Sequence, residues 1–125
     1  MNARVVCIIG ALALFSLAQA AEKKQEWTPE FKPFSGRYQV YSGSPSEKQA
    51  PTSADKQASV VITGRAAKDL FEQIGPDVKD ACGSVSNDRQ RHKGDLDCVY
   101  AKEHGYECFI GIDLRTGKST QGSVC

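Results

Sequence analysis

After its first twenty residues the sequence has no long hydrophobic run, and its formal net charge is only +1. Without a second apolar stretch, the chain has no candidate for a membrane anchor, and we expect a soluble protein. Arg4 is the only charged residue among the first twenty, so the remaining 105 residues (125 − 20) carry fifteen basic and fifteen acidic side chains. A neutral chain has no general attraction for nucleic acid or anionic membranes, and we expect neither as a partner.

The sequence also lacks the motifs that mark common catalytic and metal sites. It has no Gly-x-Ser-x-Gly nucleophile motif and no glycine pattern of the phosphate-binding kind. Its nearest cysteines, Cys98 and Cys108, are ten residues apart, whereas zinc sites commonly contain two cysteines about two to four residues apart. We therefore expect no catalytic residues, no metal and no cofactor, in a protein that is not an enzyme.

The first twenty residues have the layout of a secretory signal peptide. A basic residue, Arg4, precedes an apolar run from Val5 to Leu17, and the segment ends on the small residues Ala18 and Ala20. The run is shorter than the ~20 apolar residues that span a bilayer. We predict that residues 1–20 are removed during export and that the mature protein is periplasmic or secreted.

Removal of this segment would discard Cys7 and leave an even number of cysteines, as is usual in small exported domains. The four that stay are Cys82, Cys98, Cys108 and Cys125. If Thr116-Gly117 forms a two-residue hairpin loop, Cys108 lies opposite Cys125, which leaves Cys82 to pair with Cys98. We expect these two disulfides; a bulge in the hairpin would change the register, and a free or intermolecular Cys125 is the alternative.

The spacing of apolar residues predicts one helix and several strands. The helix begins at Thr63 or Gly64, presents one apolar face and ends at Gly75-Pro76. Short β-prone runs cover residues 34–41, 59–63, 95–101, 106–114 and 119–125, with turns at 102–105 and 115–118. Residues 21–33 form a flexible arm, and residues 42–57 and 83–94 form polar loops. The resulting fold is α+β: one helix packed on an antiparallel sheet of four or five strands, with a C-terminal β-meander, in a single domain of residues 34–125.

The densest positive segment is the basic run Arg89–Lys93, which supplies Arg89, Arg91, His92 and Lys93 as candidate binding residues. Such a run can bind an acidic protein surface or an anionic glycan. The plainer interpretation is a solvated loop whose charge is offset by Asp88, Asp95 and Asp97. A second candidate surface is the aromatic group near the mature N-terminus, which equally suits the cover of a sheet face. Its members are Trp27, Phe31, Phe34, Tyr38 and Tyr41.

The two histidines, His92 and His104, are candidates for a general base if a carboxylate such as Asp95 or Asp97 orients one of them. Solvated loop histidines and a solvent-facing pair of aspartates are the plainer interpretation. A small secreted hydrolase that uses one of these histidines is therefore an alternative function, and a polyanion-binding module built on residues 89–93 is another.

The export signal, the predicted disulfides and the missing catalytic motifs resemble the small periplasmic proteins of Gram-negative bacteria. Some of that class are lysozyme inhibitors, and one inhibitor group carries a Ser-Gly-x-Tyr motif in the loop that enters the lysozyme cleft. This chain has Ser35-Gly36-Arg37-Tyr38, which adds Ser35 and Tyr38 to the candidate binding residues, but it lacks the companion Tyr-x-x-x-Thr-Lys-Gly stretch. The preferred hypothesis is an exported, monomeric, non-enzymatic binding protein, one version of which inhibits a hydrolase.

Overall fold

A computed structural model describes residues 26–79 and 88–123 of the chain. The chain divides into two units, residues 1–30 and residues 31–125. In the first unit, residues 26–30 contain neither helix nor strand. The predicted signal peptide lies outside the described residues, as does the first part of the predicted arm.

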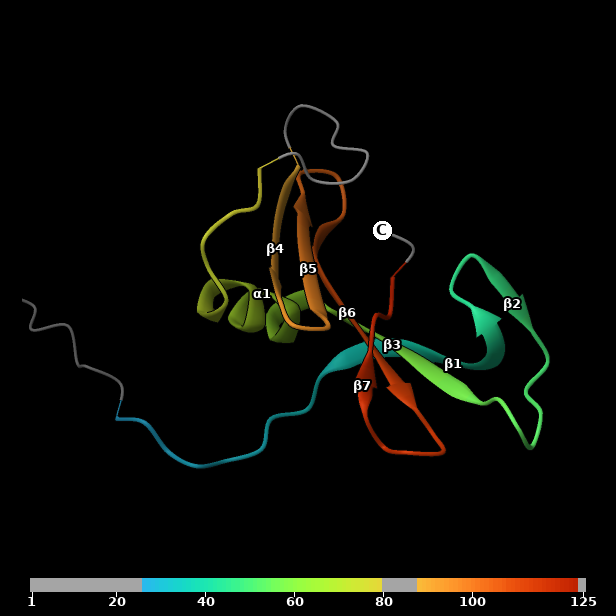
Figure 1. The fold of residues 1–125 in the computed structure, drawn as a ribbon. Helices are drawn as coiled ribbons and strands as arrows, with labels where there is room; N and C mark the ends of the chain where they lie inside the picture. The colour runs from blue at the N-terminus through green and yellow to red at the C-terminus, as the bar shows by residue number, and fades with distance from the viewer. Residues whose placement is uncertain (1–25, 80–87, 124–125) are drawn as a thin grey trace, which may run out of the picture. The chain divides into compact units, whose positions relative to one another are not determined.

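The described residues of the second unit form one helix and one antiparallel sheet (Figure 1). In chain order its elements are β1 (Ser35–Ser44), β2 (Glu47–Gln49), β3 (Gln57–Thr63), α1 (Gly64–Gln73), β4 (Arg89–Lys93), β5 (Leu96–Ala101), β6 (Gly105–Asp113) and β7 (Ser119–Thr120). Six strands follow the spatial order β2-β1-β3-β6-β5-β4. Strand β7 pairs with Gly111 and Ile112 of β6, beyond the part of β6 that pairs with β5. The helix of the described ranges is not long and apolar enough to cross a membrane.

The helix forms where the apolar spacing predicts it. Thr63 is its N-cap residue and Ile74 its C-cap residue, immediately before Gly75-Pro76. Thr63 does not cap the helix with its hydroxyl, which instead donates a hydrogen bond to the carbonyl oxygen of Ser35, 3.2 Å away, in the neighbouring strand. The apolar face of α1 buries Ala67 and Phe71 against the sheet.

The centre of the core is a disulfide between Cys98 of β5 and Cys108 of β6. Both cysteines are fully buried, and the Cys108 Sγ lies 3.4 Å from the carbonyl oxygen of Ala67. The Phe71 ring packs edge-on against Tyr106, with ring centroids 5.3 Å apart. The bridge, the helix and one aromatic pair therefore make a single small core on one face of the sheet.

The α+β class and the helix on the antiparallel sheet are confirmed, but the predicted number of strands is wrong. The described residues contain seven strands, because parts of both predicted loops are extended. Residues 42–44 continue β1 and pair with the short strand β2. Residues 89–93, predicted as loop, form the edge strand β4, where charged side chains suit an edge that faces solvent.

The preferred disulfide pairing is also wrong, because Cys98 and Cys108 are bonded to each other. The β6–β7 hairpin has a longer loop than the expected two residues. Ile112 pairs with Ser119, whereas the prediction placed Arg115 opposite Lys118. The connection is closed by Asp113, whose N–H donates to the Lys118 carbonyl, and by Gly117, whose N–H donates to the Asp113 carbonyl (2.8 and 2.7 Å). The register of the last strand is therefore shifted by two residues, because the numbers of paired residues sum to 231 in the structure and to 233 in the prediction. Cys82 and Cys125 lie outside the described residues.

Peptide mapping without reduction tests the bridge. Trypsin cleaves after Lys93, Lys102 and Arg115, which places Cys98 in the peptide 94–102 and Cys108 in the peptide 103–115. We expect these two peptides to be recovered as one disulfide-linked species by mass spectrometry, and to separate on reduction. Recovery of peptide 103–115 linked to the C-terminal peptide 119–125 instead would contradict the Cys98–Cys108 pairing.

Candidate functional site

The two arginines of the basic run Arg89–Lys93 make contacts within the protein. Side chains alternate along β4, so Arg89 and Arg91 lie on the same face as α1. Both guanidinium groups contact the Phe71 ring, with their central carbons 5.2 and 4.4 Å from its centroid. The Arg91 Nη1 also donates to the Phe71 carbonyl oxygen at 2.9 Å, near the end of the helix. The two arginines therefore hold the helix end against the sheet.

Asp77 binds both arginines from the segment that follows the helix. Its carboxylate accepts hydrogen bonds from Arg89 Nε at 2.7 Å, Arg89 Nη2 at 3.1 Å and Arg91 Nε at 2.6 Å. These bonds, first to Arg89 and then to Arg91, lower the pKa of the Asp77 carboxyl from its ordinary value of 3.8 to about 2. The same contact raises the pKa of Arg89. Of the four candidate residues in the run, His92 and Lys93 stay exposed, without side-chain hydrogen bonds to the described residues.

Ser35 and Tyr38 lie far from the basic run. They belong to β1, and strands β3, β6 and β5 separate β1 from β4, which corresponds to ~19 Å at ~4.8 Å per strand. Both residues are exposed within the strand, so Ser35-Gly36-Arg37-Tyr38 does not form a loop that could enter a cleft. A Cβ at Gly36 would overlap the carbonyl oxygen of Val61, which explains the glycine by the close approach of β3. The structure therefore does not bring the two sets of candidate residues together.

No helix of the described residues covers the opposite face of the sheet. That face carries a row of side chains that sequence reasoning did not single out. The strand register aligns Arg37, Val61, Phe109, Asp97 and His92 across five strands, and directly opposed residues share a face. The adjacent row, which contains the disulfide, faces α1, so this row faces away from it. Alternation along each strand was visible in the sequence, but the register that aligns the strands was not.

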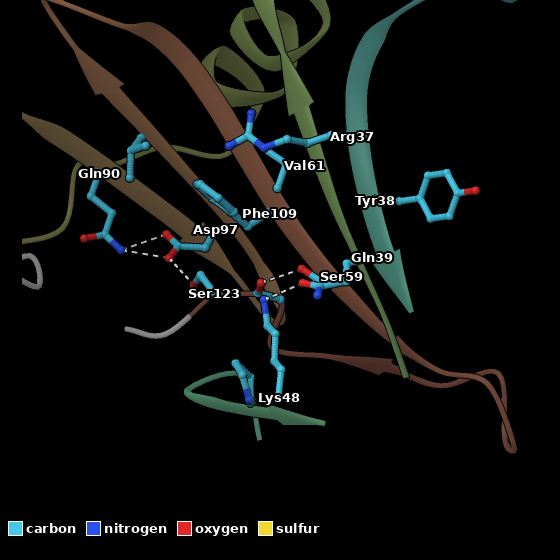
Figure 2. A pocket seen from close by; sticks show the side chains of 13 residues that line it. Arg37, Tyr38, Gln39, Lys48, Ser59, Val61, Gln90, Asp97, Phe109 and Ser123 are labelled. Carbon is cyan, nitrogen blue, oxygen red and sulfur yellow. Dashed lines mark hydrogen bonds between the residues drawn. The ribbon is translucent and has the colours of Figure 1, made fainter. Parts of the chain in front are cut away.

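This face is hollowed into a groove of about 750 Å³, which we call the open-face groove (Figure 2). Its floor is apolar and comes from Val61, Val99 and Phe109. Pro45 and Lys48 of the β1–β2 hairpin line it, and Gly122 and Ser123 line it after β7. The remaining lining residues are Arg37, Tyr38, Gln39, Ser59, Gln90 and Asp97. Figure 2 shows that the Tyr38 ring points away from the groove, so Tyr38 contributes its backbone side.

The polar groups of the groove are already held in place by one another. Asp97 is buried, and its carboxylate accepts hydrogen bonds from the Gln90 amide at 2.8 and 3.0 Å and from the Ser123 hydroxyl at 3.1 Å. It was expected to face solvent, and the strand pairing with β4 is what covers it. The Ser59 hydroxyl donates to the Gly122 carbonyl at 2.7 Å. These bonds fix the walls of the groove before any ligand arrives.

Two cations line the groove from β1 and β2. The Arg37 Nη1 lies 3.3 Å from a carboxylate oxygen of Glu107, and the Lys48 ammonium donates to the Gln39 side-chain oxygen at 3.2 Å. The Lys48 ammonium also lies 5.1 Å from the centroid of the Tyr41 ring. Tyr41 is buried, and burial, followed by the nearby Asp55 carboxylate, raises the pKa of its hydroxyl above 10.0. The ring beneath Lys48 is therefore neutral over the physiological range.

The two histidines do not form a catalytic arrangement with the described residues. His92 lies opposite Asp97 in the strand pair, yet its imidazole is exposed and makes no hydrogen bond to the described side chains. His104 lies in the β5–β6 turn, where its backbone N–H donates to the Ala101 carbonyl at 3.1 Å. Within residues 26–79 and 88–123 there is no group of three or more histidine, cysteine, aspartate or glutamate side chains placed to hold a metal ion.

A stability measurement tests the structural role of Arg91. Its side chain is 18% exposed and combines a ring contact, a hydrogen bond to a carbonyl and an ion pair. We expect Arg91→Ala to lower the free energy of unfolding in urea by about 2 kcal/mol, and the exposed control Lys93→Ala to change it by less than about 0.5 kcal/mol. Equal small effects from both variants would contradict this role.

The stability of the Asp77 contact depends on pH in a defined direction. The pKa of the Asp77 carboxyl is lower in the folded protein than in the unfolded protein, where it is ~4. Ionised Asp77 therefore stabilises the folded state at pH values above ~4. That contribution is lost as the pH falls through the folded value of about 2. Between these two pH values we expect the melting temperature of the wild type to fall more steeply with decreasing pH than that of Asp77→Asn. The control Asp88→Asn, which changes an exposed carboxylate, should show the same pH dependence as the wild type. Parallel curves for wild type and Asp77→Asn would contradict the assignment.

Comparison with protein-family models, with curated proteins and with solved structures finds no match to this chain. Any function must therefore be inferred from the geometry of the described residues. Among these, the open-face groove combines a concave shape, an apolar floor and prearranged polar groups, which is the usual character of a ligand-binding site.

Proposed function

We propose that this protein is an exported binding protein without catalytic activity, and that it binds its ligand in the open-face groove. The observation that carries the proposal is the groove itself, whose volume of about 750 Å³ falls within the ~300–1,000 Å³ typical of small-molecule sites. The export part depends on the first twenty residues, which have the signal-peptide layout. A ligand of this size can be a free small molecule or one group of a larger partner.

The chemistry of the groove favours a ligand that joins an apolar body to an anionic group. Val61, Val99 and Phe109 offer partly exposed apolar surface on the floor. Arg37 and Lys48 supply two positive charges beside it, and the Arg37 side chain is 63% exposed, so a ligand can reach its guanidinium. Charge-assisted hydrogen bonds to such groups are stronger than bonds between neutral groups. Carboxylate, sulfonate and phosphate groups all fit this description.

The proposed lack of catalysis is supported by the state of the polar groups in the groove. Asp97 is engaged with Gln90 and Ser123, and neither hydroxyl of the groove contacts a histidine. A nucleophile needs a base within hydrogen-bonding reach, which the described side chains do not provide. The alternative of a hydrolase that uses His92 or His104 therefore has no geometric support.

The two other versions of the hypothesis receive less support than the groove. A polyanion site at residues 89–93 would need the charges of Arg89 and Arg91, which Asp77 and the Phe71 ring already occupy. Inhibition of a lysozyme-type hydrolase by loop insertion would need Ser35–Tyr38 to protrude, whereas these residues pair with β3. Inhibition through the groove, by binding an acidic or aromatic group of the target, stays compatible with the proposal.

The groove can be tested with a pair of fluorescent probes. 1-Anilinonaphthalene-8-sulfonate joins an apolar ring system to an anionic group, and N-phenyl-1-naphthylamine has nearly the same rings without the charge. We expect the folded, oxidised protein to bind the sulfonate more tightly, and we expect Arg37→Ala or Lys48→Ala to weaken that binding by about tenfold. Removal of Arg37 also leaves the Glu107 carboxylate without its ion pair near the bound anion. The measurement is a fluorescence titration of each variant.

The matched control is Lys93→Ala, which removes an exposed cation from β4 at the other edge of the sheet. Its affinity for the sulfonate should equal that of the wild type, and the affinity for the uncharged probe should be similar in all variants. If Lys93→Ala weakens binding as much as Arg37→Ala does, or if the probe binds only after partial unfolding, the groove is not the site.

A further inference from the structure

Strand β1 forms an edge of the sheet that is open along most of its length. Strand β2 pairs only with Ser42–Ser44, whereas residues 35–41 pair with β3 on one side alone. In the described ranges, no backbone group outside β3 makes a hydrogen bond to residues 35–41. Seven consecutive residues of β1 therefore have one side without a partner strand from residues 26–79 or 88–123.

The strand register determines which backbone groups point out of this edge. The Cα atoms of Cys98 and Cys108 are 4.0 Å apart, which identifies a non-hydrogen-bonded pair. Pair types alternate, so Cys108 bonds to Ile62, and Gly36 and Ile62 form a non-hydrogen-bonded pair. The N–H and C=O groups of Gly36 consequently point away from β3, and so do those of Tyr38 and Val40.

A second observation supports this assignment at the other edge. The same alternation directs the carbonyl of Gln90 out of β4, and this carbonyl accepts a hydrogen bond from the N–H of Val78 at 2.7 Å. The outer edge of β4 is thus partly covered by the segment after α1, and its side chains are mostly charged. Proteins protect exposed edges in these ways against pairing with other chains.

The open edge of β1 has neither form of protection. Its seven residues contain one charged side chain, Arg37, and no proline. The side chains of Phe34, Tyr38 and Val40 are 61, 78 and 42% exposed, and alternation places all three on one face. An unprotected edge with an apolar stripe is a surface suited to strand pairing.

We propose that this edge binds the same edge of a second copy of the chain, in an antiparallel pair with Tyr38 on the two-fold axis. Residue 38 is the centre of the open segment 35–41, and it is one of the residues whose backbone groups point outward. Tyr38 then faces Tyr38 of the other copy, and Gly36 faces its Val40. All outward groups are used, since three residues with one N–H and one C=O each provide six hydrogen bonds per pair of copies.

The side chains along the edge are complementary to themselves in this register. Arg37 would face Gln39 of the second copy, so no two like charges are directly opposed within the paired segment. The Phe34 ring covers Gly36, with its Cε2 3.3 Å from where a Cβ would be. Val40 of the second copy would meet that ring opposite Gly36, and the two Tyr38 rings would meet at the axis. A second copy fits the edge better than an arbitrary strand does, and the proposal of a symmetric dimer differs from the expectation of a monomer.

Charge placed at position 38 tests the two-fold axis. In sedimentation experiments over a range of concentrations, we expect the purified, oxidised wild type to reach twice the monomer mass. Tyr38→Lys puts two ammonium groups opposite each other and should raise the dimer dissociation constant at least about tenfold, and Tyr38→Glu should act in the same way. A mixture of the two variants should restore a dimer, because opposite charges then meet at the axis. Leu114→Lys, at an exposed apolar residue outside β1, is the matched control and should not change the mass.

Cysteine substitution tests the register independently. Directly opposed residues in a hydrogen-bonded pair have Cα atoms ~5.5 Å apart, which a disulfide can bridge. With diamide as oxidant, Tyr38→Cys should give a covalent dimer, whereas Gln39→Cys, which faces Arg37 of the second copy, should stay uncrosslinked. A wild type that is monomeric at every concentration overturns the proposal. So does equal crosslinking at both positions, or a mixture of Tyr38→Lys and Tyr38→Glu that fails to dimerise.

Discussion

The fold depends on the contact between the Cys98–Cys108 disulfide and the helix. The bridge joins neighbouring strands at directly opposed positions, and Ala67 and Phe71 of α1 pack on it. In a domain of this size the apolar core is small, so a covalent link at its centre replaces part of the stabilisation that a larger core would provide. The link closes a segment of ten residues, for which chain entropy alone gives about 3 kcal/mol.

Positive charge in this protein occurs in two different structural settings. Arg89 and Arg91 stack on an aromatic ring and share one carboxylate, so they tie the segment after the helix to the edge of the sheet. Arg37 and Lys48 have long side chains beside a groove, where a ligand can reach them. Arg89 and Arg91 can be recognised in the sequence because charged residues cluster there. Arg37 and Lys48 can be recognised as a pair only from their arrangement in space.

The helix and most strands could be predicted from the sequence, because each depends on residues close together in the chain. Spacings of three and four identify Ala67 and Phe71, and Gly75-Pro76 marks the end of the helix. The disulfide could not be predicted with the same security, because it depends on register. A longer connection than the expected two-residue loop shifts the register of the last strand by two residues and moves Cys108 away from the predicted partner. Strand β4 was missed because its residues are charged, and they suit an edge strand as well as a loop.

The groove could not be predicted for a related reason. Its floor takes one residue from each of three strands, and Val61, Val99 and Phe109 become neighbours only once β3, β6 and β5 are aligned. The buried state of Asp97 was missed because Gln90 approaches it from β4, which was predicted as a loop, and Ser123 approaches it from 26 residues along the chain. Local patterns give the elements, whereas the groove arises from their alignment.

The position of the bridge links the redox environment to the face that carries the open-face groove. Val99 and Phe109 directly follow Cys98 and Cys108 in their strands, and side-chain alternation turns them to the other side of the sheet. The disulfide joins two strands on which the helix packs on one face of the sheet. The same two strands carry Val99 and Phe109, which belong to the groove floor on the other face. A chain in a reducing compartment would lack the clamp between these two strands, so its groove would take its final shape only after thiol oxidation. The ligand binding that we propose for the groove would thereby depend on an oxidised bridge.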